Sequence, residues 1–165
     1  MKFVQRPQYL AWLNDWREKP AIKVVTGIRR CGKSTLFALY IDHLLESGVK
    51  PEQIVSINLE ELEYENLLNY RELYAYLKTR LLDGGCTYVF IDEVQQCKDF
   101  EKAVDSLFVK GNLDVYITGS NAFLLSGELS TLLSGRYVQM EMLPLSFAEY
   151  REFKGVVRRL RVLPS

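Results

Sequence analysis

Short apolar runs alternate along this chain with longer segments in which apolar residues recur at helical spacing. Uninterrupted runs rich in β-branched and aromatic residues are typical of strands that are buried on both faces of a sheet. Strands that alternate with helices indicate a parallel sheet built from β–α–β units, which is the α/β fold class. The strands that we expect cover residues 22–26, 54–59, 87–91, 113–118 and 137–142.

The segments around these runs predict helices, and several of them end at residues that commonly terminate a helix. Gly48 follows the helix after the first strand, and Gly84 with Gly85 follows the helix after the second. Ser146 and Glu149 have the spacing of a capping box, so another helix should begin there. The other expected helices cover residues 9–19, 33–47, 67–82, 100–109 and 122–133.

The first strand leads into Gly27-Ile28-Arg29-Arg30-Cys31-Gly32-Lys33-Ser34-Thr35, which has the G-x-x-x-x-G-K-S pattern of a phosphate-binding P-loop. Gly27 and Gly32 let the backbone curl, and the curled loop points N–H groups at a phosphate. Lys33 can reach the β- and γ-phosphates, and the Ser34 hydroxyl can ligate Mg²⁺. Because the pattern lies between a strand and a helix, we expect this loop to bind a nucleoside triphosphate.

The third expected strand, residues 87–91, is followed directly by Asp92 and Glu93. Ligands of open α/β sheets bind at the carboxyl ends of the strands, so both carboxylates should face the nucleotide. We expect Asp92 to hold Mg²⁺, usually through its water shell, and Glu93 to polarise the attacking water. Asp-Glu pairs are common in solvated turns, but a buried strand before the pair and a P-loop upstream favour the functional interpretation.

The fourth expected strand ends in Thr118-Gly119-Ser120-Asn121. A small polar side chain at this strand end would lie near the γ-phosphate, where it could position the attacking water and report phosphate loss. Ser120 is the first candidate for this role and Asn121 the second. Both residue types also cap helices well, so the structural interpretation stays open, and one residue can serve each purpose.

Arg136 follows Gly135 just before the fifth expected strand. In nucleotide-hydrolysing rings, an arginine at this place reaches the γ-phosphate bound by a neighbouring subunit. There it offsets the charge that develops in the transition state, as an arginine finger does. The alternative is a surface arginine paired with a carboxylate. We expect the finger role, which would require a homo-oligomer in which Arg136 acts in trans.

Composition adds limits on partners and compartment. The chain of 165 residues is 48% hydrophobic and 25% charged, which is ordinary for a globular domain. Lys plus Arg and Asp plus Glu both number 21, so the net charge does not indicate nucleic acid or an anionic membrane as a partner. The 3 cysteines form no C-x-x-C pair, and no apolar stretch suggests a signal peptide or a membrane span. We therefore expect a cytoplasmic protein.

These motifs together resemble the AAA+ superfamily, specifically a prokaryotic family of AAA+ ATPases that carry a C-terminal domain of unknown function. The resemblance covers about residues 6–150. It rests on Thr26-Gly27-Ile28-Arg29-Arg30 with Gly32-Lys33-Ser34-Thr35, Phe90-Ile91-Asp92-Glu93-Val94-Gln95, Thr118-Gly119-Ser120, Gly135-Arg136, and Leu143-Pro144-Leu145-Ser146-Phe147 with Glu149-Tyr150.

The resemblance implies a P-loop NTPase fold, a three-layer α/β/α sandwich whose parallel five-stranded sheet has the order 5-1-4-3-2. It implies ATP and Mg²⁺ as ligands, Glu93 as catalytic base, a sensor at Ser120 or Asn121, and a finger at Arg136. Because the family's C-terminal domain is not matched, we expect the ATPase part of a longer protein. It would comprise an N-terminal helix packed on the core (1–20), the ATPase core (21–143) and the start of a connecting helix (144–165).

Two functions follow as hypotheses. The first is an ATP hydrolase whose turnover moves or remodels something through the C-terminal part. The second is a nucleotide-dependent switch that binds ATP and hydrolyses it slowly or not at all. Glu93 favours the first, because a pure binder needs no base there. The Asp92-Glu93 pair disfavours a small-molecule kinase, which must exclude water, and the lack of an N-K-x-D motif disfavours a GTPase.

Overall fold

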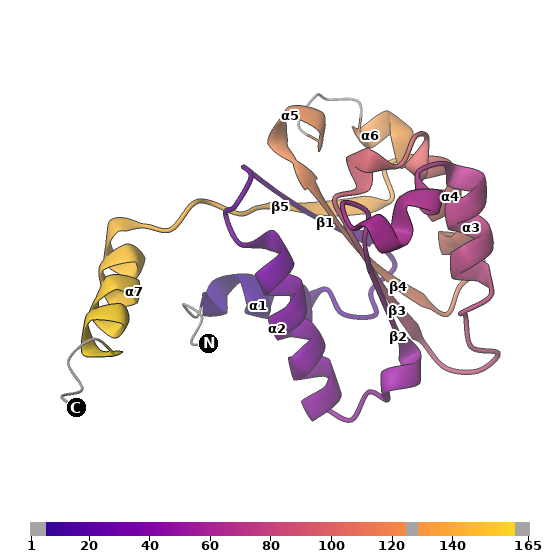
Figure 1. Cartoon of the computed structure of the whole chain (residues 1–165). Helices are drawn as coiled ribbons and strands as arrows, with labels where there is room; N and C mark the ends of the chain where they lie inside the picture. The colour runs from indigo at the N-terminus through magenta and orange to yellow at the C-terminus, as the bar shows by residue number, and fades with distance from the viewer. Residues whose placement is uncertain (1–5, 125–128, 161–165) are drawn as a thin grey trace.

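The centre of the computed structural model, which describes residues 6–124 and 129–160, is a sheet of five parallel strands (Figure 1). The order is β2-β3-β4-β1-β5, which is the expected order 5-1-4-3-2 read from the other edge. β1 therefore lies inside the sheet, paired with β4 on one side and β5 on the other. The strands are β1 (Ile22–Gly27), β2 (Ile54–Asn58), β3 (Thr87–Asp92), β4 (Leu113–Ser120) and β5 (Tyr137–Glu141).

Helices cover both faces of this sheet, so the expected three-layer α/β/α sandwich is confirmed (Figure 1). On one face lie α1 (Pro7–Asp15) and α2 (Lys33–Glu46), and on the other lie α3 (Tyr70–Lys78) and α4 (Phe100–Phe108).

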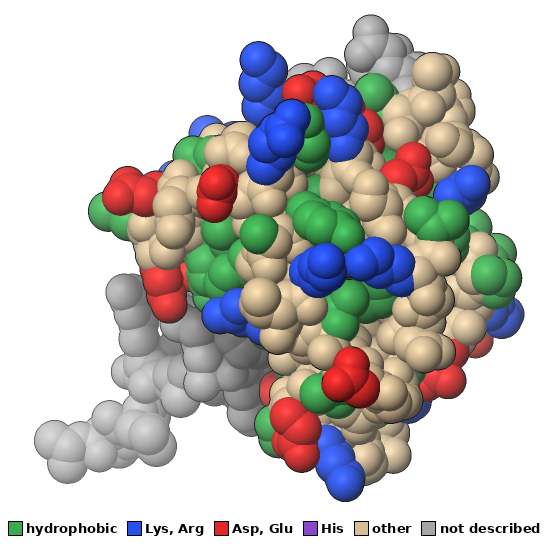
Figure 2. Space-filling view, turned by 90° about the vertical axis from the view of Figure 1, so that its right-hand side faces the viewer, with side chains coloured by type: hydrophobic (Ala, Val, Ile, Leu, Met, Phe, Trp, Pro, Cys, Tyr) green, Lys and Arg blue, Asp and Glu red, His purple; other side chains and the backbone are tan. Residues whose placement is uncertain are grey.

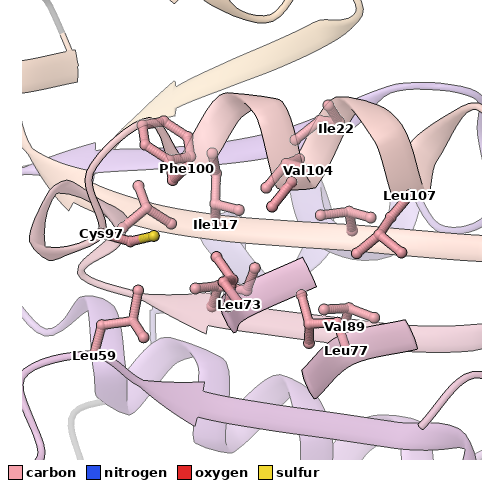
Figure 3. Close-up of a cluster of buried hydrophobic side chains, with 14 of the residues drawn as sticks. Ile22, Leu59, Leu73, Leu77, Val89, Cys97, Phe100, Val104, Leu107 and Ile117 are labelled. Atoms are coloured by element: carbon pink, nitrogen blue, oxygen red, sulfur yellow. The ribbon is translucent and has the colours of Figure 1, made fainter. Parts of the chain in front are cut away.

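Alternation along each strand divides the apolar side chains between the two faces, because successive residues of a strand point in opposite directions. In β3, Phe90 joins the buried cluster beneath α1 and α2, whereas Val89 and Ile91 join the cluster beneath α3 and α4. Figure 3 shows the second cluster, in which side chains of α4 such as Phe100 face those of the strands. Both faces are thus apolar, as the uninterrupted runs in the sequence indicate.

The helix expected over residues 67–82 is shorter in the structure. Leu67 ends a 3₁₀ segment, η2 (Leu62–Leu67), and α3 begins only after Asn69. The Asn69 side chain accepts hydrogen bonds from the backbone N–H groups of Arg71 and Glu72, at 3.1 Å each. This N-cap fixes the start of α3, because it satisfies N–H groups that have no partner inside the helix.

The remaining differences lie at segment ends. The helix expected over residues 9–19 ends at Asp15 in α1, and the segment 122–133, expected to be mainly helical, is helical in its described parts on both sides of residues 125–128. These parts are α5 (Asn121–Leu124) and α6 (Leu129–Leu132), and two further 3₁₀ segments are η1 (Pro51–Gln53) and η3 (Val94–Gln96).

The last helix, α7 (Phe147–Leu160), starts at the expected capping box and lies to the side of the sandwich in Figure 1. The Ser146 N–H donates to Glu149 Oε2 at 2.6 Å, and the Glu149 N–H donates to Ser146 Oγ at 3.2 Å. These hydrogen bonds, first that from the Ser146 backbone, lower the pKa of Glu149. Among the described residues, no helix has both the length and the apolar character needed to cross a bilayer.

Candidate nucleotide-binding site

The loop between β1 and α2 curls tightly over the carboxyl end of the sheet. Gly27 closes β1, and a Cβ atom there would lie 2.6 Å from Cys31 Sγ and 2.7 Å from the Met142 carbonyl oxygen. Arg30 and Gly32 both have left-handed backbone, with φ of 64° and 103°. Glycine is thus required at Gly27 by space and favoured at Gly32 by conformation. Cys31 is buried in the loop, which agrees with a packing role for its side chain.

The residues at the tip of the loop are open to solvent. Ile28, Arg29 and Arg30 are exposed, and Thr35 is half-buried in the first turn of α2. Arg29 Nη2 lies 3.2 Å from Glu60 Oε1, at a cleft of about 510 Å³ beside the P-loop. The tip therefore presents the cationic side chains of Arg29 and Arg30 to solvent, while the lining of the cleft also includes Glu60, Glu61 and Glu65.

Lys33 is the first residue of α2, and its side chain folds back over the loop. Its Nζ donates hydrogen bonds to the carbonyl oxygens of Gly27 and Ile28, at 3.0 Å each. Only 4% of the residue is exposed, and its Nζ lies 3.9 Å from Glu93 Oε1. The ammonium group is thus held inside the loop, where the P-loop pattern places it beside a phosphate.

Ser34 and Asp92 are in direct contact, although they are 58 residues apart in the sequence. Ser34 Oγ donates a hydrogen bond to one carboxylate oxygen of Asp92, and Thr118 Oγ1 donates to the other. Burial raises the pKa of Asp92, while these two hydrogen bonds act in the opposite direction. Hydroxyl and carboxylate oxygens are the donors that Mg²⁺ prefers, so Ser34 and Asp92 together fit this ion.

Glu93 follows Asp92 in a left-handed conformation, with φ of 57°, which turns its side chain out of the strand. Its backbone N–H donates to Thr118 Oγ1 at 2.9 Å, and Gln95 Nε2 donates to its carboxylate. Gln95 Oε1 is buried and has no hydrogen-bond partner among the described residues. A left-handed backbone is uncommon for glutamate, and at Glu93 it accompanies a carboxylate that lies beside Lys33.

Ser120 and Asn121 occupy different positions at the end of β4. Ser120 is half-buried and pairs in register with Gly27, so it lies next to the start of the P-loop. Asn121 begins α5, and its Nδ2 donates at 3.1 Å to Oε1 of Glu141, which pairs in register with Thr26 just before the P-loop. Both candidates therefore lie at the carboxyl end of the sheet near the P-loop, and the choice between them stays a prediction.

Arg136 lies at the amino end of the strands, opposite to the end that carries the P-loop. Its carbonyl oxygen accepts a hydrogen bond from the backbone N–H of Ile22, the first residue of β1, at 2.8 Å. The P-loop follows Gly27, the last residue of β1, so the two sites are separated by the length of the strand, roughly 16 Å. Arg136 is exposed, and its own chain does not bring it to the P-loop.

Three residues of this region lay outside the sequence-based predictions. Thr118 links the Asp92 carboxylate to the Glu93 backbone, and Gln95 holds the Glu93 side chain. Arg6 donates hydrogen bonds to the Cys31 carbonyl of the P-loop at 3.3 Å and to Glu149 of α7 at 3.1 Å. Each acts through a partner that is placed by the fold, although Thr118 and Gln95 do lie inside the motifs noted in the sequence.

Comparisons with known proteins agree with this geometry. A family model described as an AAA domain matches residues 19–151. An uncharacterised protein of Haemophilus influenzae is 39% identical over 161 residues, which are 97% of this chain and 40% of that protein. The uncharacterised protein MJ1544 of Methanocaldococcus jannaschii is 37% identical over 81% of this chain and 29% of its own length. The chain thus spans less than half of the curated relatives it matches.

Solved structures show the same fold at low sequence identity. The Aeropyrum pernix ORC1 protein, solved in complex with DNA, aligns with a TM-score of 0.69 and 14% identity, over 96% of this chain and 50% of that one. A DNA polymerase III gamma subunit-related protein of Thermotoga maritima aligns with a TM-score of 0.60 and 10% identity, over 92% of this chain and 49% of that one.

Proposed function

The chain belongs to the AAA domain family, and on that premise we propose that it binds ATP with Mg²⁺ and hydrolyses it. The observation on which this rests is the position of Glu93, whose carboxylate lies 3.9 Å from the buried Lys33 ammonium and directly after the Asp92–Ser34 pair. A lysine, a base and two oxygen donors for a metal ion therefore meet at one strand end. This is the set of groups that phosphoryl transfer to water requires.

Each residue would have a distinct task. Lys33 would exchange its bonds to the two loop carbonyls for the β- and γ-phosphates, which are stronger partners because they are charged. Ser34 and Asp92 would hold Mg²⁺, whose charge would offset that of the phosphates. Glu93 would take the proton of the attacking water, and Ser120 would orient that water near the γ-phosphate.

Arg6 supports a role in conformational change. Its guanidinium joins the P-loop, through the Cys31 carbonyl, to Glu149 in the first turn of α7, and it is itself buried. A shift of the P-loop on phosphate binding would alter this contact and move α7 relative to the core. In this way turnover would act on the longer protein that the length of the relatives suggests.

A nucleotide-dependent switch with little turnover is the second candidate, and one observation favours it. Gln95 Nε2 binds the Glu93 carboxylate, and Lys33 lies near its other oxygen, so the base is already engaged. A base that stays in these contacts accepts protons poorly, and ATP would then be held rather than cleaved.

Glu93→Gln separates the two functions, because the amide keeps the shape of the side chain but accepts no proton. Single-turnover hydrolysis by the full natural protein should fall by about 10²- to 10⁴-fold, with ATP affinity retained in calorimetry. Lys33→Ala is the control for binding and should lose ATP affinity. Normal hydrolysis by Glu93→Gln would exclude Glu93 as the base. ATP binding without turnover in the unaltered protein would favour the switch.

A further inference from the structure

The outer surface between α3 and α4 carries tyrosines and lysines in close contact. Tyr70 and Tyr74 lie one helical turn apart on α3, and lysine ammonium groups stand over both rings. Lys102 Nζ lies 4.9 Å from the centre of the Tyr70 ring. Lys110 and Lys78 lie 5.3 Å and 5.8 Å from the centre of the Tyr74 ring. We name these five residues the tyrosine–lysine strip.

The strip is accessible to a ligand. Its three lysines are exposed and its two tyrosines are half-buried against the core cluster beneath α3 and α4. Figure 2 looks onto this side of the molecule, where lysine and arginine side chains stand beside hydrophobic ones and acidic side chains are also present. A hydrogen bond with the Lys110 side chain lowers the pKa of the Tyr74 hydroxyl, and the charges of Lys110 and Lys78 act in the same direction.

The acidic residues of the two helices mostly face away from the strip. Asp105 accepts a hydrogen bond from Ser134 Oγ, beyond α6, at 3.4 Å, and Glu101 lies one turn before it on the same side of α4. Glu72 lies one turn before Tyr76, whose ring meets Tyr64 of η2 on the other flank of α3.

Asp99 is the exception, since its carboxylate lies 3.7 Å from Lys102 Nζ. Both of these side chains are at least partly exposed, so the pair is weak and easily exchanged for another anion.

A net charge of zero therefore conceals a separation of charge over the surface. Four glutamates gather in the segment around η2, at Glu60, Glu61, Glu63 and Glu65, while lysines gather on the strip. The overall balance of charges is thus a poor guide to the partners of one face. The field that a ligand meets is set by the groups within about 10 Å at physiological salt.

We propose that the tyrosine–lysine strip binds single-stranded nucleic acid. Its lysines supply phosphate contacts, and its rings supply faces on which bases stack, which is the combination that single-stranded sites use. Lys102 lies in the first turn of α4 and Lys110 lies just beyond its end at Phe108, so roughly 9 Å of helix separates them and they reach different phosphates of one strand. On binding, each lysine leaves a ring for a phosphate, and a base takes its place over the ring.

Fluorescence anisotropy with a labelled oligothymidylate tests this proposal at several salt concentrations. Three phosphate contacts predict a slope of log affinity against log salt of about −2, because each contact to a single strand contributes roughly −0.7. Lys102→Gln/Lys110→Gln should weaken binding and reduce the slope to about −0.7. Lys19→Gln/Lys50→Gln removes the same charge near α1 and η1 and should leave both quantities unchanged.

The rings are tested separately. Tyr70→Leu and Tyr74→Leu should each weaken binding by roughly five- to a hundredfold, whereas Tyr→Phe at either position keeps the ring and should bind nearly as well. Thermal melts show whether the leucine variants fold, and the lysine variants decide the question if they do not. Lys33→Ala should bind the oligonucleotide normally, so a failure of the ATPase proposal leaves this one intact.

Four outcomes would overturn the proposal. The first is no binding of the oligonucleotide, and the second is equal binding by the strip variants and the matched control. The third is binding to phosphatidylserine vesicles but not to the oligonucleotide, which would assign the strip to an anionic membrane surface. The fourth is tighter binding to a duplex than to the single strand, with no effect of the tyrosine substitutions, which would exclude base stacking.

Discussion

Two lysines are buried among the described residues, one at each end of β1, and their surroundings differ in charge. Lys23, at the amino end, makes an ion pair with the Asp114 carboxylate and donates to the Lys19 carbonyl at 2.9 Å. Lys33, at the carboxyl end, donates hydrogen bonds to the carbonyl oxygens of Gly27 and Ile28, and the carboxylate of Glu93 is 3.9 Å away.

The difference separates a structural cation from one that is available to a ligand. Asp114 also accepts hydrogen bonds from the Tyr116 hydroxyl at 2.7 Å and from the Glu18 N–H at 2.9 Å. The Lys23 charge is thus neutralised inside a network that fixes the turn before β1. Lys33 donates to neutral carbonyls and its nearest carboxylate is 3.9 Å away, so its charge is less fully compensated than that of Lys23, and a phosphate can supply what is missing.

The change at Arg136 has the largest expected effect. Arg136 is proposed to act in catalysis, although it lies at the amino end of the sheet, where Lys23 has a structural role. Arg136→Ala in the full natural protein should lower turnover by about 10³- to 10⁵-fold, as loss of an arginine finger does. Mixing Arg136→Ala with Lys33→Ala subunits should restore part of the activity, since an intact loop can then meet an intact finger from its neighbour.

The matched control is Arg80→Ala, which removes another exposed arginine and should leave turnover unchanged. If the two mutants co-assemble and no activity returns, Arg136 does not act in trans. Arg136 would then join Lys23 as a residue with a structural role at the amino end of the sheet.

Exchanging each buried lysine for methionine tests the comparison directly. Lys23→Met leaves the Asp114 carboxylate buried without its cation, so the free energy of unfolding should fall by about 3–5 kcal/mol. Lys33→Met should leave that free energy unchanged or raise it, because no carboxylate loses a hydrogen-bonded partner, and should abolish ATP binding. Urea denaturation and calorimetry measure the two quantities, with the exposed Lys50→Met as control. Equal destabilisation by both changes would contradict the distinction.

Gln95 gives the smallest expected effect. Its amide orients Glu93, so Gln95→Ala should lower kcat by about tenfold through loss of one hydrogen bond to a charged group, with KM unchanged. Gln95→Glu should shift the acid limb of the pH–rate profile to higher pH, because a second negative charge beside Glu93 favours its protonated form. Gln96→Ala, at the exposed neighbour, is the control. An unchanged profile in Gln95→Glu would remove Gln95 from the mechanism.

The inner strands β1, β3 and β4 could be predicted from the sequence because each is a run of residues buried on both faces, whereas the edge strands β2 and β5 are only partly buried. The strand order came from the family resemblance, since neither spacing nor composition distinguishes one parallel arrangement from another. The start of α3 was missed although Asn69 is a good N-cap, because Leu67 and Leu68 extend the apolar pattern into η2. The Asn69 side chain determines where α3 begins, and the spacing of apolar residues did not reveal this start.

The candidate site likewise contains residues that the sequence predicted and residues that only the structure revealed. Lys33, Ser34, Asp92 and Glu93 were found because the P-loop and the acidic strand end are continuous motifs, and the structure brings all four together. Thr118, Gln95 and Arg6 were missed because their importance lies in contacts across the fold. Arg6 and Glu149 are 143 residues apart, and no local pattern connects them.

The central position of β1 has a consequence for how the protein is made. Lys23 and its partner Asp114 are 91 residues apart, so the strand that carries the P-loop leaves the ribosome long before β4 exists. At about 5–20 residues per second, the delay is on the order of ten seconds. During that time the apolar strand β1 lacks both of the strands with which it pairs, and the P-loop lacks the neighbouring strand ends that surround it in the folded domain. The strand that carries the P-loop is therefore made early but can pair with its neighbours only when synthesis of this domain is nearly finished.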